Sequence, residues 1–288
     1  MAGTNYASVF RPGLFSGQVA IVTGGGSGIG RCTAHELASL GARIALVGRK
    51  NEKLKGVETE VAKAGGEARC YACDIREEDT VKQTVANILA DFGRIDYLVN
   101  NAGGQFAAPL ETISAKGWDA VVRTNLTGGF LMARECYTQW MKQAKAGAIV
   151  NIIADMWQGM PTMGHSGAAR AGMLNFTETA GFEWAPVRVN AVAPGWIASS
   201  GLDNYPAEMA PYIKALPTHV PLARIGTESE VSAAICFLLS PAAAFISGSC
   251  LRVDGAVPNA KRARVIANKN PTPAFDGFHL ARKPKVFD

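Results

Sequence analysis

The sequence predicts an α/β fold, with one doubly wound domain built on a central parallel sheet of about seven strands. Short apolar runs alternate with longer stretches of helical periodicity along most of the chain. Runs that are apolar at consecutive positions are typical of strands buried on both faces by covering helices. Because no linker interrupts the alternation, we expect a single domain over residues 1–257, followed by a basic, proline-containing extension over residues 258–288.

Each predicted strand is a short, mostly apolar segment, and in chain order these are Gln18–Thr23, Arg43–Val47, Ala68–Ala72, Ile95–Val99, Ala148–Ile152, Val187–Ala191 and Cys250–Val253. The helices between them are predicted from apolar periodicity and stop signals at Cys32–Leu40, Glu52–Ala64, Glu77–Phe92, Ser114–Lys142 and Gly167–Trp184. A capping box at Thr227–Glu230 begins a last helix that continues to Leu239. The segment Pro206–Pro221 is expected to form a helical lid over the crevice at the carboxyl ends of the strands.

Composition excludes several classes of protein. With 48% hydrophobic and 18% charged residues, the chain can bury a large core and is not a disordered chain. It has no run of about 18 apolar residues, and its first residues lack an apolar signal segment, so we expect a cytoplasmic protein with no membrane contact. Cys70 and Cys73 would point to opposite faces of a strand, so neither a redox pair nor a metal site is predicted.

The formal net charge of +5 is confined to the extension, which carries seven basic residues against Asp276 and Asp288. A nucleic-acid-binding arm would need denser charge with interleaved aromatic residues, so no nucleic-acid partner is expected. The alternatives are a solvated segment, an arm that wraps a neighbouring copy, and a contact with the phosphates of coenzyme A.

A glycine-rich turn, TGGGSGIG at residues 23–30, lies between the first predicted strand and the first helix. Glycines there permit a tight turn and let the backbone approach a pyrophosphate at the helix N-terminus, so we predict a dinucleotide site formed by Gly24, Ser27, Gly28, Ile29 and Gly30. About 20 residues further on, an NAD site has an acidic residue that holds the ribose. This sequence has Arg49 and Lys50 instead, which favour the 2′-phosphate of NADP(H), although a solvated helix start is the alternative.

Four further motifs complete a pattern, and they are Cys73-Asp74-Ile75, Asn100-Asn101-Ala102-Gly103, Asn125 in RTNLTG, and Pro194-Gly195 in NAVAPG. From Gln18 to Gly255 the chain resembles the short-chain dehydrogenase/reductase family, which has a Rossmann-type fold. The resemblance implies a homotetramer or homodimer and a catalytic role for Asn125. It also implies cofactor contacts from Asp74, Ile75, Asn101, Ala102, Gly103, Arg170, Pro194, Gly195, Ile197 and Ser199.

The family's catalytic pattern is not present in this sequence. The family has a tyrosine, three residues and then a lysine, whereas HSGAARAG at 165–172 has Ser166 and Arg170 at those positions. A serine hydroxyl is far less acidic than a phenol, and an arginine is not an acid at neutral pH. Reduction of a ketone is therefore poorly supported. Hydride addition to a conjugated thioester forms an enolate, which needs hydrogen-bond donors more than a strong acid. We predict that Arg170, Ser166 and neighbouring amides supply those donors as part of the catalytic site.

The segments HSGAARAG, NNAGGQF and VNII also resemble the NADPH-dependent trans-2-enoyl-CoA and 2,4-dienoyl-CoA reductases. Where the dienoyl branch has a donor after the fifth strand, this chain has Asp155, which we predict to protonate the α-carbon; capping of backbone amides is the alternative. Gln105, Trp157 and His165 are expected on the substrate side, with simple packing as the alternative for His165.

Three hypotheses follow. The leading one is an enzyme that uses NADPH to reduce the conjugated double bond of an acyl-CoA-type substrate. The second is an alcohol or carbonyl dehydrogenase for a branched or terpenoid substrate, in which Asp155 or His165 replaces the tyrosine. The third is a non-catalytic NADP(H)-binding regulator.

Overall fold

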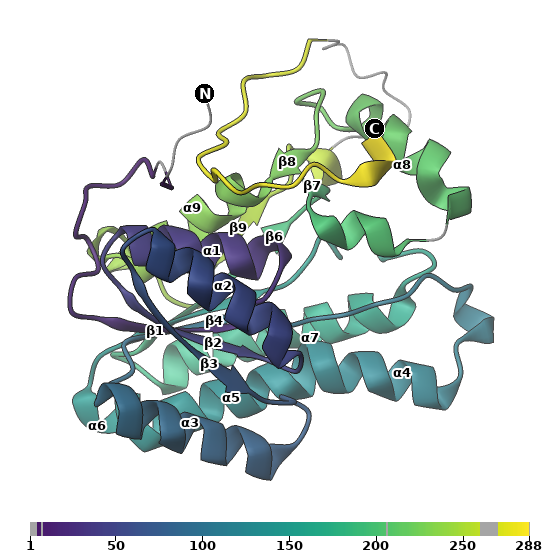
Figure 1. Ribbon diagram of the computed structural model, residues 1–288. Coiled ribbons are helices and arrows are strands. Elements are labelled where there is room, and N and C mark those ends of the chain that lie inside the picture. Colours follow the sequence, from purple (N-terminus) through teal and green to yellow (C-terminus); the bar gives the residue numbers. More distant parts are fainter. Residues whose placement is uncertain (1–4, 7, 206, 260–269, 288) are drawn as a thin grey trace.

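The computed structural model describes residues 5–6, 8–205, 207–259 and 270–287. Its centre is a seven-stranded parallel sheet in the order β3-β2-β1-β4-β5-β6-β9, which confirms the predicted fold class (Figure 1). The strands are β1 Val19–Thr23, β2 Arg43–Gly48, β3 Glu67–Ala72, β4 Tyr97–Asn100, β5 Ala148–Ile152, β6 Arg188–Pro194 and β9 Cys250–Val253. A separate pair joins β7 (Ile197–Ala198) to β8 (Gly226–Thr227).

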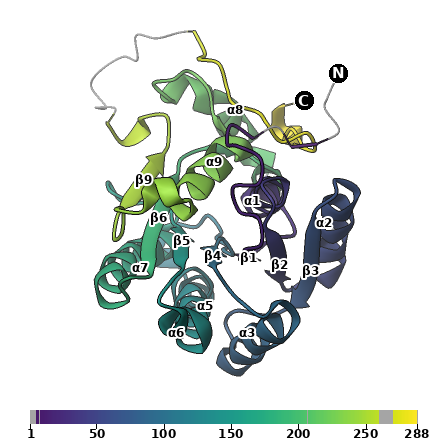
Figure 2. The same ribbon diagram turned by 90° about the vertical axis from the view of Figure 1, so that its left-hand side faces the viewer.

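Helices cover both faces of the sheet (Figure 2). One face carries α1 (Gly28–Ser39), α2 (Asn51–Lys63) and α9 (Glu228–Leu239), and the other carries α3 (Glu78–Phe92), α5 (Gly128–Cys136) and α7 (Gly164–Glu183). The shorter helices α4 (Ala115–Val122), α6 (Lys142–Ala144) and α8 (Ala210–His219) complete the set. None of the described helices combines the length and the apolar character needed to cross a membrane.

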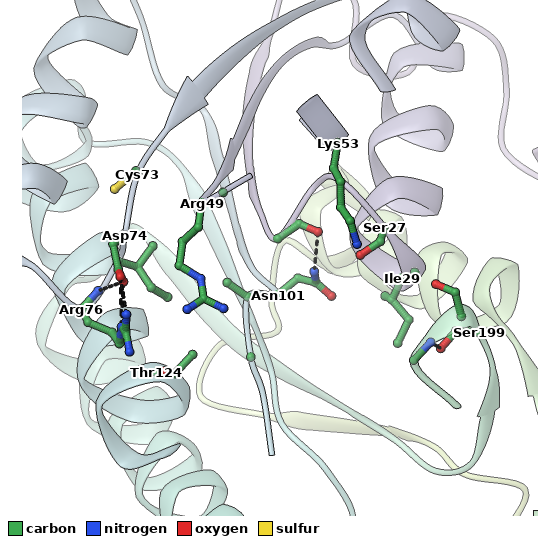
Figure 3. A pocket seen from close by; sticks show the side chains of 18 residues that line it. Ser27, Ile29, Arg49, Lys53, Cys73, Asp74, Arg76, Asn101, Thr124 and Ser199 are labelled. Carbon is green, nitrogen blue, oxygen red and sulfur yellow. Dashed lines mark hydrogen bonds and ion pairs between the residues drawn. The ribbon is translucent and has the colours of Figure 1, made fainter. Parts of the chain in front are cut away.

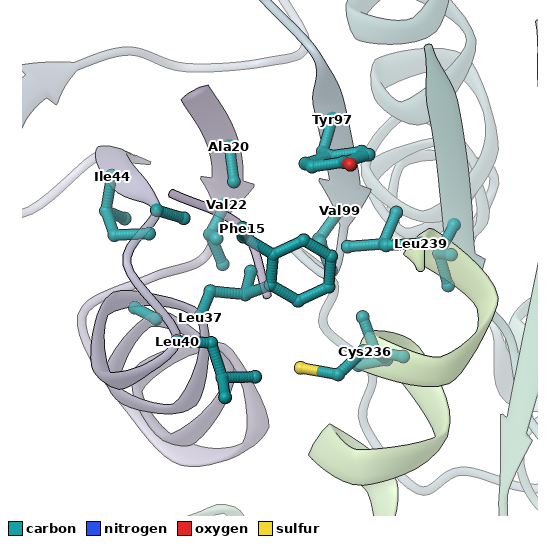
Figure 4. Packing of buried hydrophobic residues seen from close by; sticks show 14 of the residues in the cluster. Phe15, Ala20, Val22, Leu37, Leu40, Ile44, Tyr97, Val99, Cys236 and Leu239 are labelled. Atoms are coloured by element: carbon teal, nitrogen blue, oxygen red, sulfur yellow. The ribbon is translucent and has the colours of Figure 1, made fainter. Parts of the chain in front are cut away.

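Each face of the sheet has its own apolar core. On the α1 and α9 side, Phe15 is fully buried and its ring meets that of Tyr97 edge-on at 5.3 Å (Figure 4). Leu37 of α1 and Leu239 of α9 pack into the same cluster. Because both faces of β1 are buried, all five of its residues are apolar or hydrogen-bonded, which explains the continuous apolar run in the sequence.

One predicted helix start differs from the observed one at a glycine-rich segment, and one long predicted helix is interrupted. The helix predicted from Cys32 begins at Gly28, because glycines carry no side chain that could show apolar periodicity. The long helix predicted over Ser114–Lys142 is broken by two π-turns, η2 (Arg123–Thr127) and η3 (Tyr137–Met141). A π-turn inserts one extra residue and commonly marks a functional site. The capping box at Thr227 is confirmed, with both of its hydrogen bonds present.

The described part of the C-terminal extension, residues 270–287, packs against its own chain (Figure 1). Phe278 is 3% exposed, and its backbone N–H donates to Ser229 Oγ at 3.0 Å. The Arg31 guanidinium donates to the carbonyl of Leu280 at 3.1 Å. In this structure the segment is therefore docked on its own chain through a few buried residues. The basic residues Lys261, Arg262, Arg264 and Lys269 lie outside the described residues.

A buried carboxyl lies beneath this extension. Glu228, the first residue of α9, is 6% exposed, and burial raises its pKa from the ordinary 4.5 to about 7, with Arg31 opposing the shift and Asp276 adding to it. The folded state therefore holds the proton at pH values where the unfolded chain has lost it, so stability falls as pH rises between these two pKa values. We expect Glu228→Gln to be more stable than the wild type by about 2 kcal/mol at about pH 8, with the difference lost at about pH 4, measured by urea unfolding.

Glu230, in the same helical turn, is the matched control. Burial alone would raise its pKa, but bonds from Arg224 and Thr227 bring it below the usual value. Glu230→Gln should therefore lose stability at about pH 8, where Glu228→Gln gains it. A Glu228→Gln variant no more stable than the wild type at that pH would contradict the burial of this charge.

Candidate active site

Two connected cavities open at the carboxyl ends of the strands, where the crevice was predicted. The first has a volume of about 460 Å³ and the second about 640 Å³. Ile29, Asn101, Gly103, Ser199 and Gly201 line both of them, so they form one continuous site.

The glycine-rich turn forms one wall of the first cavity by close backbone packing. Gly24 has a φ of +66°, and a side chain there would come within 2.8 Å of Asn101 Nδ2. A side chain at Gly30 would lie 2.5 Å from the Gly24 carbonyl. Thr23 Oγ1 accepts hydrogen bonds from the backbone N–H groups of Asn101 and Ala102 at 3.0 and 2.9 Å. The turn and the end of β4 are thus held together, as the dinucleotide motif requires.

Two cationic side chains line the first cavity at different places, with Arg49 on the side of Asp74 and the Lys53 amine beside Ser27 (Figure 3). Arg49 and Lys53 both line it, and no ion pair of either is found among the residues that the structure describes. Asp74 also lines it but is neutralised by Arg76, which donates to Asp74 Oδ1 at 2.9 Å and holds the pKa of that carboxyl below its usual value. The first cavity therefore has the positive charge to hold the anionic groups of a dinucleotide.

Most of the predicted cofactor residues meet here. Gly24, Ser27, Gly28, Ile29, Arg49, Asp74, Ile75, Asn101, Ala102, Gly103 and Ser199 line the first cavity, and Pro194, Gly195, Ile197 and Arg170 line the second. Lys50 does not line either cavity, because it is exposed at the N-cap of α2, whereas Lys53, one turn later, lines the first cavity beside Ser27.

Arg170 projects from α7 into the wall of the second cavity. Its Nη1 donates to the Ile152 carbonyl at 2.6 Å, and its Nε is buried without a hydrogen-bond partner. Burial lowers the pKa of the guanidinium to about 10, so it remains a cation at neutral pH. A side chain at Gly103 would lie 2.5 Å from Arg170 Nη2, which shows how closely the strand β4 loop approaches this cation.

Ser166 lies behind the cavity wall, and it lines neither cavity. It is fully buried, and its hydroxyl donates to Gln105 Oε1 at 2.8 Å. Asn125, in the π-turn η2, donates to Ser166 Oγ at 3.4 Å and to the Gly104 carbonyl at 3.0 Å. Ser166 thus supports Gln105, which does line the second cavity, and is not placed to donate directly to a substrate.

The other three predicted residues also lie outside the two cavities. His165 is fully buried, packs edge-on against Phe106 at 4.4 Å, and has an Nε2 without a partner, in agreement with the packing alternative. Burial and then Asp254 raise the pKa of Asp155, but this carboxylate accepts the backbone N–H of Trp157, as the capping alternative expects. Trp157 is 42% exposed and lies beside the Arg252 guanidinium.

Besides Lys53, sequence reasoning missed Tyr205. It lines the second cavity and its Oη accepts a hydrogen bond from Gln105 Nε2 at 3.0 Å. It belongs to a segment, residues 199–219, that we call the lid; this segment contains η4 (Ser200–Asn204), η5 (Ala207–Met209) and α8, and Pro206 lies outside the described residues. The predicted lid began at Pro206, one residue too late to include this tyrosine. No motif marks Tyr205 in the sequence.

Comparison with known proteins agrees with this geometry. A family model described as enoyl-(acyl carrier protein) reductase matches residues 24–257. The peroxisomal 2,4-dienoyl-CoA reductase of Danio rerio is 35% identical over 87% of this chain and 84% of its own length. The 3-oxoacyl-[acyl-carrier-protein] reductase of Synechocystis is 40% identical over 83% of this chain and 96% of its own. The solved structure of a citronellol catabolism dehydrogenase from Pseudomonas aeruginosa PAO1 shares 61% identity, with a TM-score of 0.79, and covers 88% of this chain and 99% of that one.

Proposed function

The chain belongs to the short-chain dehydrogenase/reductase family of nicotinamide-dependent oxidoreductases, and we propose that it uses NADPH to reduce the conjugated double bond of an enoyl thioester. One observation carries the proposal. The wall of the second cavity presents a half-buried cation, Arg170, where the family has a lysine, and α7 offers no phenol beside it.

We assign the first cavity to the adenine half of the cofactor. Backbone N–H groups of the glycine-rich turn would hold the pyrophosphate at the N-terminus of α1, where the Lys53 amine lies beside Ser27. Arg49 would face the 2′-phosphate, and Asp74 with Ile75 would border the adenine. Asn101, Ser199 and the residues after β6 hold the nicotinamide half. When bound, the cofactor supplies a hydride to the substrate.

Arg170 supplies the charge that this reaction needs. Addition of a hydride at the β-carbon moves negative charge onto the thioester oxygen, and a fixed donor in a poorly solvated wall stabilises that oxygen strongly. The Arg170 side chain lines the second cavity, so its positive charge lies close enough to stabilise that oxygen. A ketone would instead need prompt proton transfer to a localised alkoxide, which neither Ser166 nor Arg170 can provide.

The test is NADPH consumption, followed by absorbance, with a short trans-2-enoyl-CoA and a 2,4-dienoyl-CoA, and with an aldehyde and a ketone in parallel. We expect turnover with a thioester and little with either carbonyl compound. Turnover with the carbonyl compounds alone would overturn the substrate class and leave the fold and the cofactor site intact.

A second candidate function is oxidation of a branched acyclic terpenoid alcohol. It is favoured by the 61% identity to the citronellol catabolism dehydrogenase. The discriminating assay is citronellol with NADP⁺ and with NAD⁺. Turnover there, with none on the thioesters, would select this candidate.

Arg49 is predicted to select NADPH over NADH. A charge-assisted bond to a phosphate contributes about 2 kcal/mol, so Arg49→Ala should raise the Kd for NADPH about 30-fold and change the Kd for NADH less than about 2-fold. The measurement is cofactor fluorescence titration. Lys50→Ala, at the exposed neighbouring position, is the control and should leave both values unchanged. An equal loss of affinity for both cofactors in Arg49→Ala would contradict the assignment.

We also propose a homotetramer or homodimer that forms through α4, α5 and α7. These helices expose Trp118, Phe130 and Phe182, of which Phe182 is 87% exposed. Light scattering coupled to size exclusion measures the assembly, and a monomer at micromolar concentration would refute it.

A further inference from the structure

The hydroxyl of Tyr205 occupies an unusual position, because it is held from the lid and not from α7. Its ring packs in the lid cluster with Leu202, Ile213 and Trp196. It lines the second cavity together with Arg170. The extended C-terminal segment supports this part of the lid, since Lys285 N donates to Asp203 Oδ1 at 2.9 Å.

A chain of hydrogen bonds leads to this hydroxyl, and every bond in it has the same direction. Asn125 donates to Ser166 at 3.4 Å, Ser166 donates to Gln105 at 2.8 Å, and Gln105 donates to Tyr205 at 3.0 Å. The orientation of the Asn125 amide, where this series of hydrogen bonds starts, is fixed because its Oδ1 accepts the backbone N–H of Gly104 at 2.9 Å. The Tyr205 oxygen is therefore an acceptor, and within the described residues no group accepts its hydrogen.

This arrangement prepares Tyr205 to release a proton into the cavity. The Gln105 N–H remains directed at the phenol oxygen and stabilises the negative charge that is left after proton release. Hydrogen bonds that run in one direction polarise one another and strengthen this effect. Ser166, at the position where the family has its tyrosine, is small and serves as a link in the chain.

We propose that Tyr205 is the proton donor of the reaction, a catalytic residue delivered by the lid. The inference rests on the proposed enoyl reduction. Hydride addition forms a C–H bond at the β-carbon, and the electron pair of the double bond moves into an enolate. The O–H bond of Tyr205 then breaks, its proton forms a C–H bond at the α-carbon with the enolate pair, and the thioester carbonyl is restored. The Tyr205 phenolate regains a proton from water through the open cavity.

The other candidate donors do not reach the cavity. Asp155 accepts a backbone N–H outside the cavity lining, and His165 is sealed against Phe106. Tyr205 is the only tyrosine among the described residues that lines one of the two cavities.

The decisive variant is Tyr205→Phe, which keeps the ring and removes the hydroxyl. We expect kcat to fall about 100-fold, with the KM within about 3-fold and the Kd for NADPH unchanged. Tyr212→Phe is the matched control: Tyr212 is on the same lid, 50% exposed, and lines neither cavity, so its removal should leave kcat unchanged. A Tyr205→Phe enzyme within about 3-fold of wild-type kcat would overturn the proposal.

A double-mutant cycle tests the chain of hydrogen bonds. Gln105→Met should lower kcat about 10-fold in the wild type and have no further effect in Tyr205→Phe, because the bond acts only through this phenol. Independent, multiplying effects would refute that role for Gln105. The proposed function is tested by which substrates the wild type turns over. The role of Tyr205 is tested by the ratio of the variant's kcat to the wild-type kcat on a substrate that is turned over. The two can therefore fail separately, because the ratio is measured on whichever substrate the wild type turns over.

Discussion

Replacing Arg170 with methionine is expected to lower kcat/KM for the enoyl thioester about 1000-fold, equivalent to about 4 kcal/mol, without destabilising the fold. The catalytic loss has a direct cause. Removing one preorganised donor to a developing oxyanion typically costs 100-fold to 1000-fold, and here the donor also carries the charge of the cavity wall. Steady-state kinetics with NADPH at saturation measure the effect.

Stability should respond in the opposite direction to activity. The Arg170 guanidinium is desolvated, and desolvation is the one cause of its lowered pKa, with no acidic partner contributing among the described residues. Replacing such a cation with an apolar side chain of similar length is commonly neutral or stabilising. Urea unfolding of Arg170→Met should therefore give a free energy equal to or above that of the wild type.

Arg170→Lys is the control that separates charge from geometry. It keeps the cation but loses the Nε–H and the bond to the Ile152 carbonyl, so we expect partial activity, between those of wild type and Arg170→Met. If Arg170→Met retained turnover within about 3-fold of wild type, the role of this cation in catalysis would be refuted.

The fold could be predicted from the sequence because its two strongest signals are local. A strand buried on both faces must be apolar at consecutive positions, as β1 and β5 are, and the tight turn after β1 requires glycine at positions such as Gly24. Each signal is carried by residues that are neighbours in the sequence. The helix start at Gly28 and the π-turn at Asn125 were missed because neither leaves a periodic trace in side-chain type.

The site was predictable only where a motif lies beside the strand that positions it. Arg49 follows β2 directly and Asp74 follows β3 after one residue, and both line the first cavity. Gln105 and Tyr205 are joined across 100 positions of sequence, and their contact depends on how the lid folds over the sheet. Tertiary packing likewise decides that Gln105, and not Ser166, lines the second cavity.

The extension shows the same limit. Its charge and prolines suggested a solvated or partner-wrapping segment, but charge gives no information about the few apolar residues that anchor it. Phe278 enters a pocket formed by Tyr6, Cys32 and His35, with the Arg31 guanidinium 5.0 Å from its ring centre. Three residues of the extension, Val286, Phe287 and Lys285, then reach the lid.

Phe278→Ala is therefore expected to reduce the free energy of unfolding by about 4 kcal/mol, because it leaves a cavity in a site where the ring is 3% exposed. Phe245→Ala is the control, since Phe245 is fully exposed and its removal should change the free energy by less than about 0.5 kcal/mol. Urea unfolding at neutral pH measures both. A loss below about 1 kcal/mol for Phe278→Ala would mean that the extension is not docked on its own chain in solution, and an arm that wraps a neighbouring copy would then be the better account of its charge.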